Sequence, residues 1–92
     1  MVLGTIADIT PNGAAVALSA TEGALATWIK LTASGSTIRV GDANVGTGRG
    51  LVCPSGVETY LPPVAFDQGM YDLTAVYIYG TGADKVSVTY GI

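Results

Sequence analysis

A regular alternation of apolar and polar residues between Trp28 and Gly50 constrains the fold more than any other feature of this sequence. Every second residue over 28–33 is aliphatic, and the same pattern resumes over 37–41 after the small turn residues 34–36. A period of two residues is typical of a β-strand with one buried face. The stretch is therefore predicted to form a β-hairpin with one aliphatic face, followed by a short glycine-rich return over 46–50.

A second strand pair is predicted towards the C-terminal end. Residues 72–79 (DLTAVYIY) and 85–90 (KVSVTY) are rich in β-branched and aromatic side chains, and the segment between them contains two glycines. This spacing is typical of a hairpin, which we expect at the centre of the sandwich. Its first strand is apolar on both faces, so one face is expected to pack in the core. Tyr77 and Tyr79, on the other face, are expected to meet a neighbouring chain or to cover the sandwich edge.

Turn signals separate several further short strands, at intervals of about 8 to 12 residues. Strands are predicted over 14–19 and 57–61, and a strand with a glycine bulge or a close backbone approach over 45–53. We expect one all-β domain over 13–92, a small antiparallel β-sandwich or barrel, with a jelly roll favoured over a simpler Greek-key sandwich. Residues 1–12 are expected to form an N-terminal arm or an edge strand.

The composition favours a protein that works through contacts with other chains. Of the 92 residues, 49% are hydrophobic and only 12% are charged, against a usual charged share of about 25%. A domain of this size buries only about 60 to 65% of the surface that its unfolded chain exposes. Some apolar surface is therefore expected to remain outside the domain core and to be hidden against other chains.

Charge and hydropathy exclude two classes of partner. The formal net charge is −3 and the pI is about 4.3, so we expect no nucleic-acid partner, because such binders neutralise phosphates with many basic residues. No apolar run approaches the roughly 18 to 20 residues that span a bilayer, and the first ten residues lack the features of a secretory signal. A soluble protein made in the cytoplasm, without a membrane partner, is expected.

The single cysteine, Cys53, excludes an internal disulfide and is predicted to pack as a small apolar residue.

The sequence offers little equipment for catalysis. It contains no histidine, which is the usual general base and the commonest metal ligand, and one cysteine cannot complete a zinc site. We therefore expect no enzymatic activity, no cofactor and no metal. Most of the seven carboxylates flank predicted turns, where an aspartate side chain accepts hydrogen bonds from its own backbone. We therefore expect them to cap turns. The alternative interpretation is that two of them form the acid and nucleophile of a glycosidase.

Two short motifs have a binding interpretation as well as a structural one. The glycine-rich segment 46–50 superficially resembles a nucleotide-binding loop, but the residues after it cannot start a helix, so a glycine bulge is favoured. Asp42 and Asn44 have the spacing of the first two ligands of a calcium loop, although the rest of that loop is missing. A turn capped by these side chains is favoured there.

Aromatic and basic side chains are the candidates for contact with a partner. The tryptophan and the tyrosines at 60, 77, 79 and 90 could stack on sugar rings, but such residues more often anchor a core or an interface. Arginine binds carboxylates through two parallel hydrogen bonds. The polar face of the first hairpin is expected to carry Trp28, Lys30 and Arg39 together. The predicted interface residues are Trp28, Lys30, Arg39, Arg49, Tyr77 and Tyr79.

Five segments carry a family resemblance. They are WIKLTA over 28–33, IRVGDANV over 38–45, GLVCPSG over 50–56, YDLTAVYIYG over 71–80 and GADKVSVTYG over 82–91. In this order the segments resemble small structural proteins of tailed bacteriophages. The resemblance implies a virion protein made in the host bacterium, a capsid decoration or cement protein of jelly-roll type on the outside of the phage head. It also implies two partners, the major capsid protein and further copies of the chain, as a homodimer or homotrimer.

The residues are also compatible with two other functions. A module of the phage tail, of a tail fibre or of the base of a head fibre would be part of the same virion but would be present in fewer copies. A carbohydrate-binding β-sandwich would use Trp28 and the tyrosines as a stacking platform. Quenching of the tryptophan fluorescence by glycans would distinguish this last function from the other two.

Overall fold

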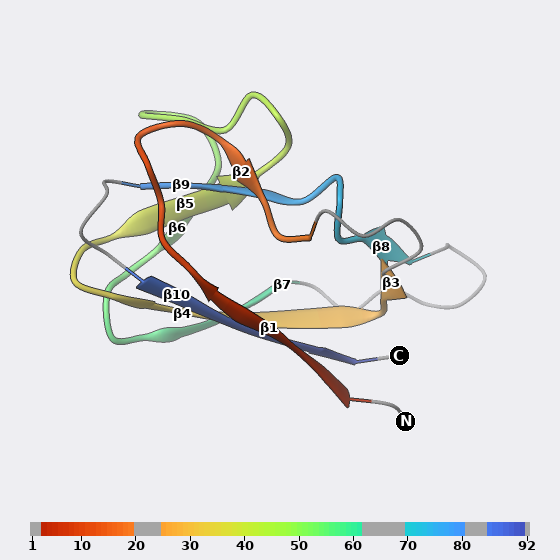
Figure 1. Cartoon of the computed structure of the whole chain (residues 1–92). Helices are drawn as coiled ribbons and strands as arrows, with labels where there is room; N and C mark the ends of the chain where they lie inside the picture. Colours follow the sequence, from red (N-terminus) through yellow and green to blue (C-terminus); the bar gives the residue numbers. More distant parts are fainter. Residues whose placement is uncertain (1–2, 20–24, 62–69, 81–84, 92) are drawn as a thin grey trace.

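The computed structural model describes residues 3–19, 25–61, 70–80 and 85–91, and every regular element among them is a β-strand (Figure 1). The all-β prediction is therefore confirmed. The strands, in chain order, are β1 (Leu3–Ile9), β2 (Val16–Ala17), β3 (Leu25–Ala26), β4 (Trp28–Ser34), β5 (Ile38–Gly41), β6 (Leu51–Cys53), β7 (Glu58–Leu61), β8 (Tyr71–Asp72), β9 (Tyr77–Tyr79) and β10 (Lys85–Gly91). No helix of the length and hydropathy needed to cross a membrane occurs in this described part of the chain.

The strands pair as if the chain were one long antiparallel hairpin folded back on itself. The first strand pairs with the last, β1 with β10, and the pairs β2–β9, β3–β8, β4–β7 and β5–β6 follow inward. The innermost turn of this hairpin is the segment 42–50, between β5 and β6. Two further antiparallel pairs, β10–β4 and β5–β9, roll the hairpin into two sheets.

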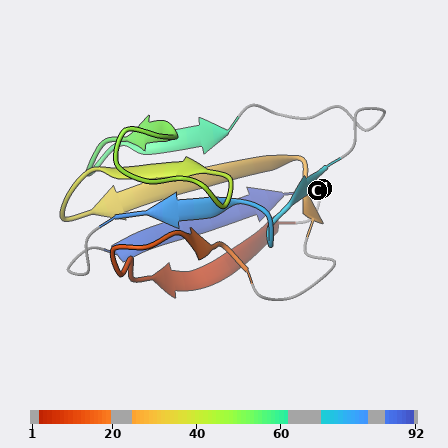
Figure 2. The same cartoon turned by 90° about the horizontal axis from the view of Figure 1, so that it is seen from above.

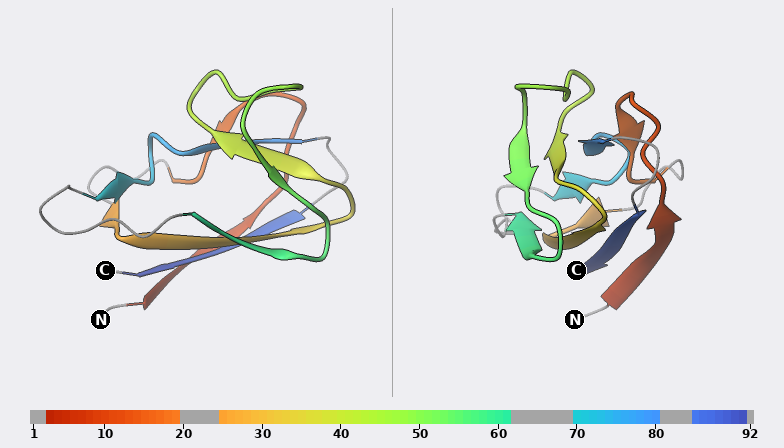
Figure 3. Two further views of the ribbon diagram at one scale, coloured as in Figure 1. Left: turned by 180° about the vertical axis from the view of Figure 1, so that it is seen from behind. Right: turned by 90° about the vertical axis from the view of Figure 1, so that its left-hand side faces the viewer.

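The two large sheets lie face to face with the core between them (Figures 2 and 3). The β4 sheet has the strand order β1-β10-β4-β7, the β5 sheet has the order β2-β9-β5-β6, and the short pair β3–β8 forms a third sheet. Alternate residues of each strand point inward, as the pleat of a strand requires. The largest fully buried aliphatic side chains are Ile29, Leu31, Ile38, Leu73, Ile78, Val86 and Val88.

The predicted hairpin over 28–41 is wrong, because β4 and β5 are consecutive strands of different sheets. Both strands have the predicted alternation and both bury their aliphatic residues, but they do so from opposite sides of the core. The chain crosses between the sheets at 34–36, where Gly35 has a φ of 106° that suits glycine. A period of two residues indicates that a strand has one buried face, and it carries no information on which strand lies beside it.

The predicted C-terminal hairpin is wrong for the same reason, since β9 belongs to the β5 sheet and β10 to the β4 sheet. Its first strand is also interrupted. The carboxylate of Asp72 accepts hydrogen bonds from the backbone N–H of Thr74 at 2.9 Å and from its hydroxyl at 2.7 Å, and the N–H of Ala75 donates to the Asp72 carbonyl at 2.9 Å. These bonds form a turn, and the Thr74 hydroxyl and then its N–H lower the pKa of Asp72. The strands β9 and β10 are nevertheless interior strands of their sheets.

Other segments agree with the sequence analysis in part. Residues 3–9, within the predicted arm or edge strand, form β1 at the edge of the β4 sheet. The strand predicted over 14–19 is reduced to β2, and that predicted over 57–61 forms β7. Residues 46–50 of the bulged strand form a turn, and only 51–53 are a strand. The interstrand residues 81–84 lie outside the described residues.

Candidate interaction surfaces

The residues predicted as interface candidates divide between the two outer faces of the sandwich. Trp28 and Lys30 lie on the outer face of the β4 sheet, where they alternate with the buried residues of β4. Arg39, Tyr77 and Tyr79 lie on the outer face of the β5 sheet. The expectation that Trp28, Lys30 and Arg39 share one face is therefore wrong, and its cause is the crossing between β4 and β5.

Strand register and a folded-back loop bring four of the candidates together on the β5 sheet. Arg39 is the direct cross-strand neighbour of Tyr79, and Tyr77 is the neighbour of Gly41. The loop 42–50 carries Arg49 and touches this face, because the Thr47 hydroxyl donates to the Tyr79 hydroxyl oxygen at 3.2 Å. Below, the surface formed by Arg39, Thr47, Arg49, Tyr77 and Tyr79 is called the arginine–tyrosine face.

Backbone hydrogen bonds fix the shape of the loop 42–50. The Asp42 carboxylate accepts from the N–H of Asn44 at 2.9 Å, and the Asp42 carbonyl accepts from the N–H of Val45 at 3.0 Å. These bonds form the side-chain-capped turn that the sequence favoured over a calcium loop. The N–H of Arg49 then donates to the carbonyl of Gly46 at 3.0 Å, and Gly48 has a φ of 83°, which is the pattern of a type II turn.

Residues of the loop line two shallow hollows, and one arginine lines each hollow. One hollow, of about 290 Å³, is lined by Asp42, Asn44 and Arg49 together with Gly41, Val45 and Gly50. The other, of about 180 Å³, is lined by Thr37, Arg39, Thr47, Tyr79 and Gly80. The Arg39 guanidinium donates to the Gly50 carbonyl at 3.3 Å, so its orientation is set by the loop. Both arginines can therefore present N–H donors to a partner that covers this face.

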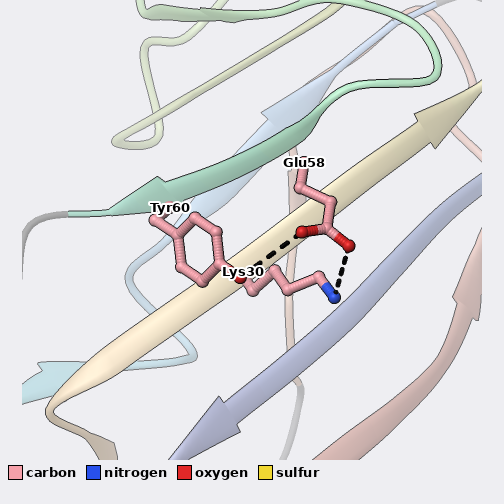
Figure 4. Close-up of polar contacts among 3 residues, drawn as sticks. All are labelled: Lys30, Glu58 and Tyr60. Atoms are coloured by element: carbon pink, nitrogen blue, oxygen red, sulfur yellow. Dashed lines mark hydrogen bonds and ion pairs between the residues drawn. The ribbon is translucent and has the colours of Figure 1, made fainter.

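The outer face of the β4 sheet carries a small polar network (Figure 4). The Lys30 ammonium lies 2.9 Å from a carboxylate oxygen of Glu58, and the Tyr60 hydroxyl donates to the other oxygen at 3.4 Å. Lys30 and Tyr60 are direct neighbours on β4 and β7. The hydrogen bond and then the charge of Glu58 raise the pKa of Lys30, and the same two effects of Lys30 lower the pKa of Glu58.

The lowered pKa of Glu58 gives a testable pH dependence. Because this pKa is lower in the folded state than in the unfolded chain, the ion pair stabilises the fold above the ordinary glutamate value of 4.5, and this contribution is lost as the pH falls through the lower value. We expect the Glu58 carboxyl to titrate at a higher pH in the Lys30→Gln variant than in the parent protein, as followed by NMR. Lys85→Gln, which removes an exposed lysine elsewhere, serves as the control and should leave the midpoint unchanged. Equal midpoints in all three proteins would contradict the ion pair.

The aromatic platform considered for sugar binding is not assembled. Trp28 and Tyr60 lie on the outer face of the β4 sheet, whereas Tyr77 and Tyr79 lie on that of the β5 sheet. The Trp28 indole lies over Gly91, and the ring of Tyr90 lies over Gly4, so in both cases an absent Cβ leaves room for the ring. Tyr90 also packs against the hydrophobic core. The five aromatic residues are therefore divided between separate surfaces, and only Trp28 and Tyr60 share the outer face of the β4 sheet.

One apolar surface was missed by the sequence analysis. Of the six exposed large apolar side chains in the described part of the chain, four belong to β6, β7 and the turn between them: Leu51, Val52, Val57 and Tyr60, the last two 52% and 57% exposed. The strands β6 and β7 are the edges of their respective sheets and lie on the same side of the molecule (Figure 3). This surface is called the β6–β7 side. Periodicity could not reveal it, because an apolar residue on an edge strand looks like a core residue in the sequence.

Cys53 packs in the core beside this side, as predicted. The residue is fully buried, and burial raises the pKa of its thiol, partly offset by a hydrogen bond from Thr59. The described residues hold no group of three or more histidine, cysteine, aspartate or glutamate side chains that could bind a metal ion.

The described residues thus form a small all-β protein with two four-stranded antiparallel sheets and one two-stranded sheet. Comparisons with family models, with curated proteins and with solved structures found no match for this chain.

Proposed function

We propose that this chain is a structural protein of a bacteriophage particle, a decoration protein that binds the outside of the head and cements neighbouring major capsid subunits without enzymatic activity. The observation that carries the proposal is the gathering of Arg39, Tyr77 and Tyr79 on one face, with the loop that carries Arg49 folded against Tyr79. Arginine and tyrosine are enriched among the residues that dominate protein interfaces. The phage origin rests on the resemblance of the sequence segments described above.

The strand pairing supports a narrower statement of the fold. A chain paired as β1–β10, β2–β9, β4–β7 and β5–β6, and rolled into two four-stranded sheets, is the expected arrangement of a jelly roll. We propose this topology for the protein. Jelly rolls occur in viral capsid proteins and in lectins, so the topology agrees with a virion role without deciding between these classes.

The proposed mechanism is additional contact area between capsid subunits. A stable protein interface buries about 1,600 Å² in total, and repetition of one modest contact over a shell resists internal pressure through the number of contacts. The two arginines would bind carboxylates or backbone carbonyls of the capsid subunits. The tyrosines would supply rigid contact area with a polar hydroxyl at the end.

The proposal is tested on phage heads that lack the chain, to which purified protein is added back. We expect bare heads to assemble but to release their genome at a lower temperature than decorated heads, as measured by the fluorescence of a DNA-binding dye during heating. Copy counting by mass spectrometry is expected to place the protein in many copies on the head. Equal release temperatures, or a few copies confined to the tail, would contradict the cement function.

Single charge reversals locate the contact surface. Arg39→Glu and Arg49→Glu are each expected to weaken binding to bare heads by at least about tenfold, because a buried arginine contact is lost and a repulsive charge is introduced. Lys85→Glu changes the net charge by the same amount at an exposed position of β10 and should bind normally. Equal occupancy for all three variants would remove the arginine–tyrosine face from the interface.

A further inference from the structure

The two edges of the β4 sheet differ in how they meet solvent. At the β1 edge the pairing with β10 shifts register between Ile6 and Ile9, and the charged Asp8 lies within this irregular segment, where the Ser87 hydroxyl donates to its carboxylate. Bulges and charges are the usual protection of an edge strand against pairing with another chain. The β7 edge pairs with β4 in unbroken register and carries exposed apolar residues. Although β7 carries the charge of Glu58, it has no bulge, and no strand among the described residues pairs with its free side.

We propose that the β6–β7 side is the interface of a twofold symmetric homodimer in which β7 pairs antiparallel with β7 of a second copy. This pairing would join the two β4 sheets into one continuous sheet. It would also bring the exposed apolar side chains Leu51 and Val57 of the two copies against one another. The occupant is thus a second copy of this chain.

The sequence around β7 selects the register of this pairing. Directly opposite residues of antiparallel strands point to the same face of a sheet. Each residue of β7 must therefore pair with a residue of the second copy that points to the same face. This condition places the twofold axis at a residue that pairs with its own copy. With the axis at Thr59, residues 57–61 of the two copies pair and Glu58 lies opposite Tyr60 of the second copy. With the axis at Tyr60, Glu58 would lie opposite Pro62, which has no N–H to donate. The register centred on Thr59 avoids both prolines that follow β7.

Charges on this side are compatible with a second copy of the same chain. Glu58 is the only charged residue over 51–61, and its carboxylate already has an ion pair with Lys30. The approach of two identical surfaces therefore brings together no unpaired charges, the usual cost of a symmetric contact. The Tyr60 hydroxyl, which donates to Glu58 of its own chain, would lie across the strand from Glu58 of the second copy. The polar contacts of this side are thus self-complementary.

The dimer is independent of the proposed function, because it leaves the arginine–tyrosine face on the outer side of the β5 sheet uncovered. Sedimentation equilibrium of the purified protein is expected to give a dimer. Val57→Lys should raise the dimer dissociation constant by at least about tenfold, with an unchanged circular dichroism spectrum. Leu3→Lys places the same charge on the β1 edge, at a residue that is 66% exposed, and should leave the constant unchanged. A monomeric or trimeric parent protein, or equal effects of the two variants, would overturn the dimer and leave the head-binding test unaffected.

A cysteine pair tests the register. Glu58→Cys and Tyr60→Cys chains, mixed and mildly oxidised, are expected to form a disulfide-linked heterodimer, because directly opposite Cα atoms lie about 4.5–5.5 Å apart. Each variant alone should form little or none, since like residues are then diagonal, roughly 7–8 Å apart. Efficient cross-linking of Tyr60→Cys by itself, or no preference for the mixture, would overturn this register.

Discussion

Replacing Leu31 by alanine is expected to lower the free energy of unfolding by about 2–5 kcal/mol. Leu31 is fully buried, and it lies on β4, the strand between β10 and β7, opposite Val88 on one side and Thr59 on the other. Neighbours on both strands hold the backbone in place, so the cavity left by the missing atoms cannot readily collapse. The total stability of a domain is only about 5–15 kcal/mol, so this one substitution removes a large part of it.

Urea denaturation monitored by tryptophan fluorescence measures this loss. Leu3→Ala is the matched control, since the same side chain is there 66% exposed and its removal should change the stability by less than about 0.5 kcal/mol. The midpoint should fall in Leu31→Ala with an unchanged dependence on urea concentration. Similar midpoints for the two variants would show that the inner face of β4 is not the core of this protein.

Replacing Gly50 by alanine is expected to cost roughly 2–5 kcal/mol, from two separate causes. Gly50 has a φ of 111°, which residues with a Cβ rarely adopt. An added Cβ would also lie 2.6 Å from the Cγ2 atom of Val45 and 2.8 Å from the backbone carbonyl oxygen of Val40. The close backbone approach predicted within 45–53 is thus found at Gly50, where the loop returns over β5.

Two other glycines of the same loop separate these causes. Gly48 also has a positive φ, but no atom lies within 4 Å of its Cβ position, so Gly48→Ala should show the conformational cost alone. At Gly46 the Cβ position is open and φ is not positive, so Gly46→Ala should be almost neutral. Thermal unfolding of the three variants is expected to give losses in the order Gly50, Gly48, Gly46. Equal losses would contradict the geometry of this loop.

The Gly50 variant also tests how the loop supports the proposed binding surface. The Gly50 carbonyl accepts the hydrogen bond from Arg39, and Thr47 of the same loop contacts Tyr79. A shift of the backbone at Gly50 would therefore disturb both arginine hollows. The order of the loop, as well as the charges of Arg39 on β5 and Arg49 in the loop, contributes to the arginine–tyrosine face.

The sequence by itself determined that the chain is built of strands, and which side chains of β4 and β5 are buried. Ile29 and Leu31, and likewise Ile38 and Val40, alternate with polar residues and are all buried. Glycine and asparagine at 12–13 likewise marked a turn, in which the Asn12 side chain accepts from the N–H of Ala14. Such features depend only on the period of the pleat and on local backbone preferences, so they can be derived from short stretches of residues.

Only the tertiary structure decided which strands are neighbours, and with them the surfaces. The burial of β4 and β5 is the same whether they pair with each other or face each other across a core, so their sequences could not reveal that Lys30 and Arg39 lie on opposite faces. The gathering of Arg39 and Tyr79 depends on pairing between residues far apart in the chain. The exposure of Val57 depends on β7 being an edge. Long-range pairing is a property of the whole chain, because the position of each strand in a sheet depends on where all the other strands lie.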